Sequence, residues 1–138
     1  MIAIIRIHGR VKLKEEIKET LSRLRLRRKL VCVLVEENDR TKLSMVEKVR
    51  GYVTYGKIDD DLIKQIIEKR GETIDGKKID KKNVNKIFEG IEKGEWKIKR
   101  FFRLHPPVGG FKKSTKQFSP KGILGKNKDI SKLIARML

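Results

Sequence analysis

Apolar positions in the first third of the chain change their spacing several times, and each spacing predicts one element. Residues 1–8 alternate, with Ala3, Ile5 and Ile7 on one side, which is typical of a strand. Residues 12–26 place Leu or Ile at positions 13, 17, 21 and 24, which is one face of a helix. The continuous apolar run over 30–35 predicts a buried strand.

A second helix and a third strand follow. Asp39 or Thr41 is suited to cap a helix that runs to about Arg50, and residues 52–55 predict a short strand. The first 56 residues therefore have the order β-α-β-α-β. Because each connection is a helix, both helices can cover one face of a three-stranded sheet, and an α+β fold is expected.

The remaining apolar patterns predict three more helices, over 59–70, 80–93 and 130–138. The first of these begins with the run Asp59–Asp61, and successive helical side chains point about 100° apart, so the three carboxylates do not converge on a metal ion. Stabilisation of the helix N-terminus is the preferred interpretation of this run. The last helix carries apolar residues at 130, 133, 134 and 137, and we expect it to dock on the core.

Charge is distributed unevenly along these elements. The chain has 138 residues and a formal net charge of +18, of which residues 1–58 carry +8, residues 59–96 carry −1 and residues 97–138 carry +11. A basic surface built from the two ends of a chain indicates a polyanionic partner, nucleic acid or an anionic membrane. The membrane alternative is weaker, since no apolar run approaches the roughly 20 residues of a spanning helix and no signal peptide is predicted.

The most basic stretch is 97–128, which holds ten Lys or Arg residues, no Asp or Glu, four Gly, three Pro and four Phe. Gly and Pro interrupt helices and central strands, so a long loop is expected, held at both ends by the neighbouring helices. Phe111 and Phe118 are expected to pack against Trp96 or the last helix, with stacking on bases as the alternative.

A second basic cluster, with five cations in seven residues over 23–29, follows the first predicted helix. Two interpretations of it are equally favoured: a solvated helix end stabilised by the helix dipole, and phosphate contact.

Positive evidence for catalysis is missing from the sequence. Cys32 lies in the apolar run 30–35 and is interpreted as a small buried hydrophobe, and a single Cys is compatible with a reducing compartment. His8 and His105 lack neighbours with zinc-ligand spacing, and neither GxxxxGK[ST] nor GxGxxG is present. We therefore expect no enzyme, metal site, cofactor or small-molecule substrate.

Several segments resemble a known family. The similarity lies in three parts of the chain: the opening IAIIRIHGR with the strand VCVLV, the segment VRGYVTYGKIDDDLIKQIIEKRGETIDGKKID, and VGGFKKSTKQF followed by DISKLIARML. These segments are similar to the L thirty family of large-subunit ribosomal proteins, in its longer archaeal form. The eukaryotic counterpart of that family is L seven. Thr54 departs from the pattern, where a small residue such as Ala is expected. The long basic N-terminal arm of eukaryotic members is absent, and short bacterial members end near Lys57.

The resemblance implies a ferredoxin-like βαβαβ core over 1–58 with a three-stranded antiparallel sheet and helices on one face. It implies a helical extension over 59–96, a basic RNA-binding loop over 97–128 and a docked helix over 129–138. It also implies the partners: large-subunit rRNA, 5S rRNA nearby and other large-subunit proteins, on cytoplasmic ribosomes.

The leading hypothesis is a structural rRNA-binding protein, in which cations neutralise phosphates and the loop inserts between RNA helices. A free RNA- or DNA-binding chaperone or regulator outside the ribosome is the alternative, and an RNA-modifying enzyme ranks third. The predicted RNA-binding residues are Arg23, Arg25, Arg27, Arg28, Arg40, Lys42, Arg50, Arg100, Arg103, His105, Gly109, Gly110, Lys112, Lys113, Lys116, Lys121 and Lys126.

Overall fold

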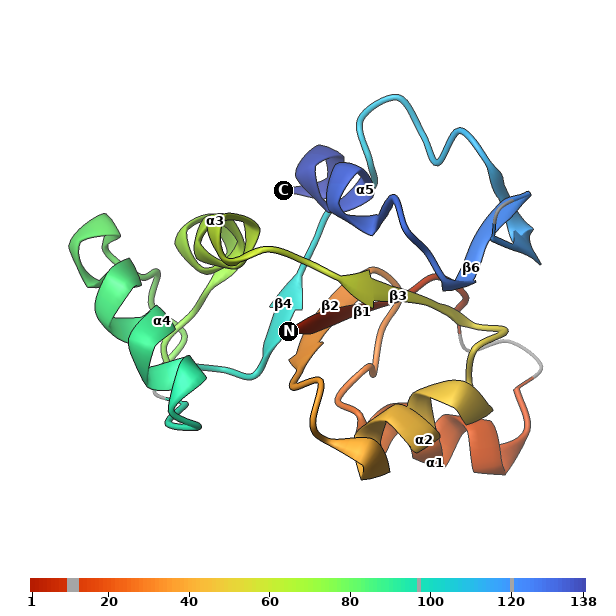
Figure 1. Cartoon of the computed structure of the whole chain (residues 1–138), viewed down its shortest axis with the longest axis horizontal. Helices are drawn as coiled ribbons and strands as arrows, with labels where there is room; N and C mark the ends of the chain where they lie inside the picture. Colours follow the sequence, from red (N-terminus) through yellow and green to blue (C-terminus); the bar gives the residue numbers. More distant parts are fainter. Residues whose placement is uncertain (10–12, 97, 120) are drawn as a thin grey trace.

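A computed structural model describes residues 1–9, 13–96, 98–119 and 121–138. The predicted start of the first helix at Lys12 lies outside the described residues, as do Lys97 and Pro120 of the basic stretch. The elements follow the order β1 (Ile2–Arg6), α1 (Glu15–Arg23), β2 (Val31–Val35), α2 (Arg40–Lys48), β3 (Val53–Lys57), α3 (Asp60–Arg70), the short 3-10 helix η1 (Lys81–Asn83), α4 (Val84–Glu92), β4 (Phe101–Arg103), β5 (Ser114–Phe118), β6 (Gly122–Lys126) and α5 (Ile130–Met137) (Figure 1).

The strands of the described residues form one mixed sheet with the order β4-β2-β1-β3-β6-β5. The central strand β1 is antiparallel to both β2 and β3, which confirms the α+β class with a three-stranded antiparallel core. The sheet extends further than predicted. β4 is antiparallel to β2, and β6 is parallel to both β3 and β5.

The added strands β4, β5 and β6 lie within the stretch 97–128, which the sequence predicts as a loop. β4 is only three residues long, and β5 reads STKQF, without an apolar alternation that would reveal it. The connection from β4 to β5 keeps the irregular character expected from its Pro and Gly residues.

Helices cover both faces of this sheet. α1 and α2 pack on the face that carries Ile4, Val33 and Val53, whereas α3, α4 and α5 pack on the face that carries Ile5 and Phe102. Figure 1 shows α1 and α2 below the sheet, and α3 and α5 above it. The alternation of side chains along a strand therefore directs successive residues into two separate apolar clusters.

The capping contacts at the helix ends agree only in part with those predicted from the sequence. Asp39, one of the two expected candidates with Thr41, caps α2 by accepting a hydrogen bond from the Lys42 amide at 3.1 Å. Asp59 precedes α3 but its side chain makes no capping hydrogen bond, so the acidic run acts through Asp60 and Asp61 in the first turn, near the positive end of the helix dipole. At α5, Asn127 Oδ1 accepts the Asp129 amide at 3.0 Å.

Gly56 in β3 marks the place where the end of β6 closes onto the core. A Cβ atom at this position would lie 2.4 Å from the Asn127 carbonyl oxygen and 2.8 Å from Ile130 Cγ2. The Asn127 amide also donates to the Tyr55 carbonyl at 2.8 Å. The glycine thus permits the close approach that seats the β6–α5 connection against β3.

Candidate nucleic-acid interface

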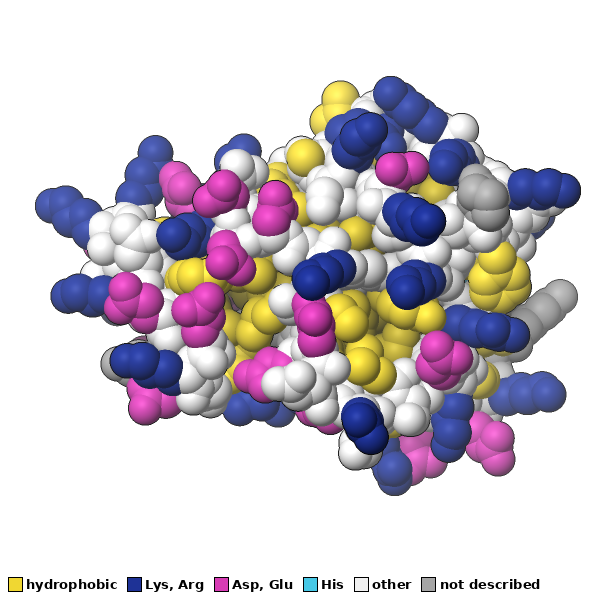
Figure 2. Space-filling model, in the orientation of Figure 1, with side chains coloured by type: hydrophobic (Ala, Val, Ile, Leu, Met, Phe, Trp, Pro, Cys, Tyr) yellow, Lys and Arg dark blue, Asp and Glu magenta, His cyan; other side chains and the backbone are white. Residues whose placement is uncertain are grey.

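The two ends of the folded chain differ in charge. Acidic and basic side chains are mixed over α3 and α4, on the left of Figure 2, while Lys and Arg are more numerous than acidic side chains at the upper right, beyond β6. This surface agrees with the sequence, in which 59–96 is nearly neutral and 97–138 is strongly basic. The candidate interface comprises the β4 edge and the β5 edge, the two outer sides of the sheet.

The β4 edge carries arginines from two distant parts of the chain, and we call this group the arginine edge. β4 pairs with β2, with Arg103 opposite Val31 and Phe101 opposite Val33. This pairing brings the residues of β4 beside the connection between α1 and β2. The members of the arginine edge are all exposed; they are Arg25, Arg27, Arg28, Arg100 and Arg103.

A hollow of about 370 Å³ lies within the arginine edge, and we call it the arginine pocket. Its cationic walls are Arg25, Arg27, Arg28 and Arg103, and its apolar lining is Val31 and Phe101. Four guanidinium groups around one hollow create a positive potential suited to a phosphate.

A smaller hollow next to the arginine pocket is lined by Arg23, Arg25, Lys42, Arg100 and Trp96, among others. The Arg100 guanidinium lies over the Trp96 ring, 5.7 Å from its centroid, and Arg103 lies 6.0 Å from the centroid of Phe101. Both contacts are within the range of cation–π attraction. They hold these two cations against aromatic surface at the edge of the sheet.

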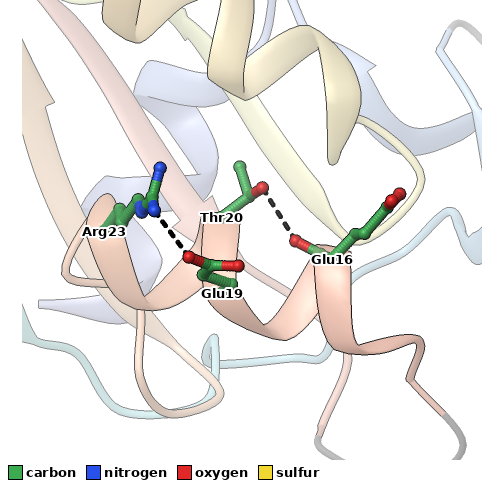
Figure 3. Close-up of polar contacts among 4 residues, drawn as sticks. All are labelled: Glu16, Glu19, Thr20 and Arg23. Carbon is green, nitrogen blue, oxygen red and sulfur yellow. Dashed lines mark hydrogen bonds and ion pairs between the residues drawn. The ribbon is translucent and has the colours of Figure 1, made fainter.

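Arg23 differs from its neighbours because a carboxylate already faces it. Its Nη2 lies 2.5 Å from Glu19 Oε1, one helical turn earlier in α1 (Figure 3). The same helix face holds Thr20, whose hydroxyl donates to the Glu16 carbonyl at 2.8 Å. RNA contact by Arg23 would compete with this exposed ion pair, and it stays a prediction.

The connection that carries Arg25, Arg27 and Arg28 is held firmly at both ends. The Leu26 amide donates to the Leu21 carbonyl at 2.8 Å and the Arg25 amide to the Ser22 carbonyl at 3.0 Å, which is the Schellman pattern at a helix C-terminus. The buried Arg6 side chain donates to the Leu26 carbonyl at 2.7 Å.

At the far end of this connection, the Leu30 amide donates to the Arg6 carbonyl at 2.8 Å. The Leu30 carbonyl accepts from the Leu104 amide at 3.1 Å, just beyond β4. Main-chain contacts thus fix both the α1–β2 connection and its position relative to β4.

The β5 edge is lysine-rich, and we call its exposed cations the lysine edge. Lys112 and Lys113 precede β5, Lys116 lies on it, Lys121 lies just before β6, and Lys126 ends β6. The Lys113 ammonium lies 3.6 Å from Asp129. The other members project from a short strand pair and its connections.

The connection that leads to the lysine edge is held by the last helix. Arg136 in α5 donates to the Gly110 carbonyl at 2.5 Å, and the Val108 amide donates to the Arg136 carbonyl at 3.0 Å. His105 places Nδ1 2.6 Å from the Pro106 oxygen and Nε2 2.5 Å from the Leu138 oxygen. Because both ring nitrogens face oxygens of the chain itself, RNA contact by His105 stays a prediction.

Gly109 and Gly110 both have positive φ, 80° and 77°. A Cβ at Gly110 would meet nothing within 4 Å, and one at Gly109 would meet only the end of the Lys112 side chain at 4.0 Å. The backbone conformation therefore explains these glycines, and the open space around them leaves room for a partner to approach.

The remaining predicted residues are dispersed. Arg40, at the start of α2, is exposed, and Lys42 lines the smaller hollow. The Arg50 guanidinium lies over the Phe118 ring at 5.6 Å, on the lysine side. Phe111 is partly buried against the core and lines one hollow with Leu133 of α5, as the packing interpretation predicts. Phe118 is instead half exposed, at 49%, and the contact found for its ring is with Arg50.

Other chemistry has little support in the described part of the chain. Burial raises the pKa of the Cys32 thiol to about 12, so the thiol stays protonated near neutral pH, and its interpretation as a buried hydrophobe is confirmed. The described residues contain no group of three or more His, Cys, Asp or Glu able to hold a metal ion. None of the helices they form has the length and apolarity that a bilayer crossing needs.

Sequence reasoning did not include three residues of this surface. Phe101 and Trp96 line the hollows beside the arginines, and Arg136 positions the connection before the lysine edge. An aromatic residue flanked by cations, as in Lys99-Arg100-Phe101, was a signal available for the first of these.

Comparison with known proteins gives a consistent result. The family described as "Ribosomal protein L30p/L7e" matches residues 2–53. "Large ribosomal subunit protein uL30" of Korarchaeum cryptofilum is 40% identical, covering 100% of this chain and 95% of the relative. The proteins of the same name from Staphylothermus marinus and Methanothrix thermoacetophila are each 36% identical, covering 100% and 99% of this chain and 98% and 99% of themselves.

Proposed function

The chain belongs to the ribosomal protein L30p/L7e family, in the form of its archaeal relatives, and from this we propose that it is a structural component of the large ribosomal subunit that binds and stabilises folded rRNA. The family is structural and not enzymatic. RNA binding is the finer part of the proposal and depends on the surface of this chain.

The observation that carries the proposal is the presence of exposed cations at both edges of the sheet. The arginine edge and the lysine edge lie on opposite sides of the antiparallel core. Cations that neutralise phosphates release counterions, which supplies much of the affinity for RNA. Two basic edges separated by a rigid sheet are suited to bridging two RNA segments.

The predicted RNA contacts follow from this arrangement. We propose phosphate contact by both edges, with further contributions from Arg40, Lys42 and Arg50. Gly109 and Gly110 would allow an RNA backbone to approach the connection before β5, since the space around them is open. Arg23 and His105 complete the proposed set, although each already has a partner within the chain.

We propose large-subunit rRNA as the main partner, 5S rRNA as a neighbour and other large-subunit proteins as further contacts, on ribosomes in the cytoplasm. The 5S contact rests on the family resemblance alone. A free chaperone or regulator would bind nucleic acid without travelling with the ribosome, and sedimentation separates it from the present proposal.

The first test is sedimentation of native cell extract through a sucrose gradient, before and after a high-salt wash. We expect the protein to travel with the large subunit and to survive a moderate wash. Its presence in the light fractions only would overturn the ribosomal role and favour the chaperone or regulator.

A second test addresses RNA contact directly. Changing Lys112, Lys113 and Lys116 to Ala should weaken binding to large-subunit rRNA and lower the slope of log affinity against log salt by about 2. A matched control removes the same charge from the mixed surface of the helical extension, by changing Lys77, Lys82 and Lys86 to Ala. An unchanged slope in the first variant, or an equal loss in the control, would show that the lysine edge does not contact phosphates.

A further inference from the structure

The arginine pocket combines cations with apolar surface, which simple phosphate neutralisation does not require. Its floor contains Val31 and Phe101, while Arg25, Arg28 and Arg103 stand among its walls. Phe101 is only partly buried. A ligand in this hollow therefore meets both cations and an aromatic ring, and Lys99 and Arg103 each lie 6.0 Å from the centroid of that ring.

The sheet explains why this apolar surface is uncovered. Side chains alternate along β4, so Phe102 enters the cluster beneath α3 and α5, while Phe101 and Arg103 face the side of α1 and α2. Phe101 belongs to the rim of that second cluster and stays partly accessible. An aromatic residue at the rim of a basic hollow is then available to a flat ligand.

Arg25 occupies a backbone conformation that disfavours any side chain. Its φ is 66°, and it sits at the position after the α1 C-cap where the Schellman pattern usually places Gly. A non-glycine residue with this φ is disfavoured by contact of its Cβ with the backbone. A guanidinium at this strained position, directed into a basic hollow, motivates a functional explanation.

Three arginines of the pocket differ from the neighbouring Arg23 in their ion pairing. Among the described residues, no ion pair joins an Asp or Glu to Arg25, Arg28 or Arg103, whereas Arg23 nearby is paired with Glu19. Like charges held together by a fixed main chain repel one another. An anionic ligand would relieve that repulsion.

The size and chemistry of the pocket limit the kinds of ligand that it can bind. A volume of about 370 Å³ lies near the small end of ligand pockets, which span roughly 300–1,000 Å³. Guanidinium groups bind phosphate oxygens in pairs, and an aromatic ring accepts a stacked base. In duplex RNA the bases are paired inside the helix, so only an unpaired nucleotide can present a base to the floor of the pocket.

We propose that the arginine pocket binds one unpaired nucleotide of an RNA, with its phosphate on Arg25, Arg28 and Arg103 and its base against Phe101. This proposal rests on the proposed RNA-binding function and adds the form of RNA recognised at this edge. The hollow at Lys112 and Lys113 is also lined by Phe111, but Asp129 lines it too and lies 3.6 Å from the Lys113 ammonium. In this proposal the lysine edge therefore contacts the backbone without selecting unpaired nucleotides.

The test uses the full chain and two RNA hairpins that are identical except for one bulged nucleotide in the stem. Binding is followed by the fluorescence of Trp96, the single Trp of the chain, which lines the hollow next to the arginine pocket. We expect the bulged hairpin to bind about tenfold more tightly, an effect within the range attributed to one base–aromatic stack.

Two variants locate the effect. Arg25→Gly removes the guanidinium at a position whose φ suits glycine, and Phe101→Leu keeps an apolar side chain without a ring. Both should reduce the tenfold preference to less than about threefold. The matched control, Lys112→Ala with Lys113→Ala, should weaken binding of both hairpins equally and leave the preference intact.

The outcomes separate this proposal from the one on which it rests. Equal affinity of the wild-type chain for the two hairpins, or an unchanged preference in both pocket variants, would overturn the nucleotide site while leaving RNA binding in place. Failure to bind either hairpin or large-subunit rRNA would overturn the RNA-binding function itself. Uridine monophosphate binding as tightly as the bulged hairpin would assign the pocket to free nucleotides instead of RNA.

Discussion

At the β4 edge of the sheet the exposed cations are arginines around aromatic rings, whereas at the β5 edge they are lysines on a strand pair and its connections. The arginine edge is fixed by main-chain hydrogen bonds of Leu26 and Leu30 to the core. The lysine edge depends on the seating of β6 against β3 and on α5. Arginine suits paired, oriented contacts and lysine suits adaptable point charges, so equal charge at two edges does not mean equal recognition.

The largest effect is expected from a substitution that separates the lysine edge from the core. Gly56→Ala would place a Cβ 2.4 Å from the Asn127 carbonyl oxygen, and we expect a loss of about 3 kcal/mol in the free energy of unfolding. Urea denaturation measures this loss. Gly51→Ala is the control, since a Cβ there meets nothing within 4 Å. Equal midpoints for the two variants would contradict the close approach described for β3.

Exchanging arginine for lysine at one edge, and lysine for arginine at the other, tests the difference between the two edges without changing the net charge. Replacing Arg25, Arg28 and Arg103 by Lys should lower RNA affinity about tenfold, because paired guanidinium contacts are lost. The slope of affinity against salt should stay the same, since the number of charges is unchanged.

The reciprocal variant, Lys112, Lys113 and Lys116 to Arg, is the control, with an expected change of less than about threefold. Measuring RNA affinity over a series of salt concentrations distinguishes the effect at the arginine edge from that at the lysine edge. An equal response from both edges would remove the distinction drawn between them.

The strain at the arginine edge predicts a smaller effect, of opposite sign. Arg25→Gly should raise the free energy of unfolding by about 1 kcal/mol, since Gly adopts positive φ without a Cβ contact. Arg28→Gly provides the control: its φ is not positive, and here Gly should destabilise by about 0.5–1 kcal/mol through backbone entropy. Thermal denaturation of the two variants measures whether each is more or less stable than the wild type. A less stable Arg25→Gly variant would contradict backbone strain at Arg25.

The smallest effect is expected between the edges, at the end of the central sheet. A hydrogen bond and the charge of Lys57, helped by the N-terminal amine, hold the pKa of Glu37 below its ordinary value of 4.5. A lowered folded-state pKa contributes stability above pH 4.5 that is lost as the pH falls through the folded value. Glu37→Gln should therefore flatten the acid side of the stability profile slightly. A profile identical to that of the wild type would show that these exposed contacts contribute nothing.

The sequence predicted the core well because its signals are local. Alternation around Ile5 and the apolar run containing Val33 correctly predicted β1 and β2, and Asp39 is the cap of the two candidates, Asp39 and Thr41. The strands β4, β5 and β6 were missed, since pairing with a distant partner, more than any apolar period, makes them strands.

The arginine pocket could not be predicted from local sequence patterns either, because it also depends on strand pairing between distant parts of the chain. Arg25 and Arg103 were each predicted as cations that contact RNA, but only the pairing of β4 with β2 brings them to one hollow. The ion pair of Arg23 with Glu19 had an available signal, the spacing of four residues on one helix. The positive φ of Arg25 had none, because Gly is the residue expected there.

The strands that flank the core also affect how free copies of the chain meet one another. A three-stranded sheet standing alone would leave the outer sides of β2 and β3 unpaired, and such rows of main-chain groups invite cross-strand aggregation. Here β4 and β6 occupy those sides. The outermost strands are short and carry Arg103 and Lys116, and short, like-charged outer strands oppose pairing with a second copy. The same cations that meet RNA in our proposal thus favour colloidal solubility during the interval between synthesis and assembly.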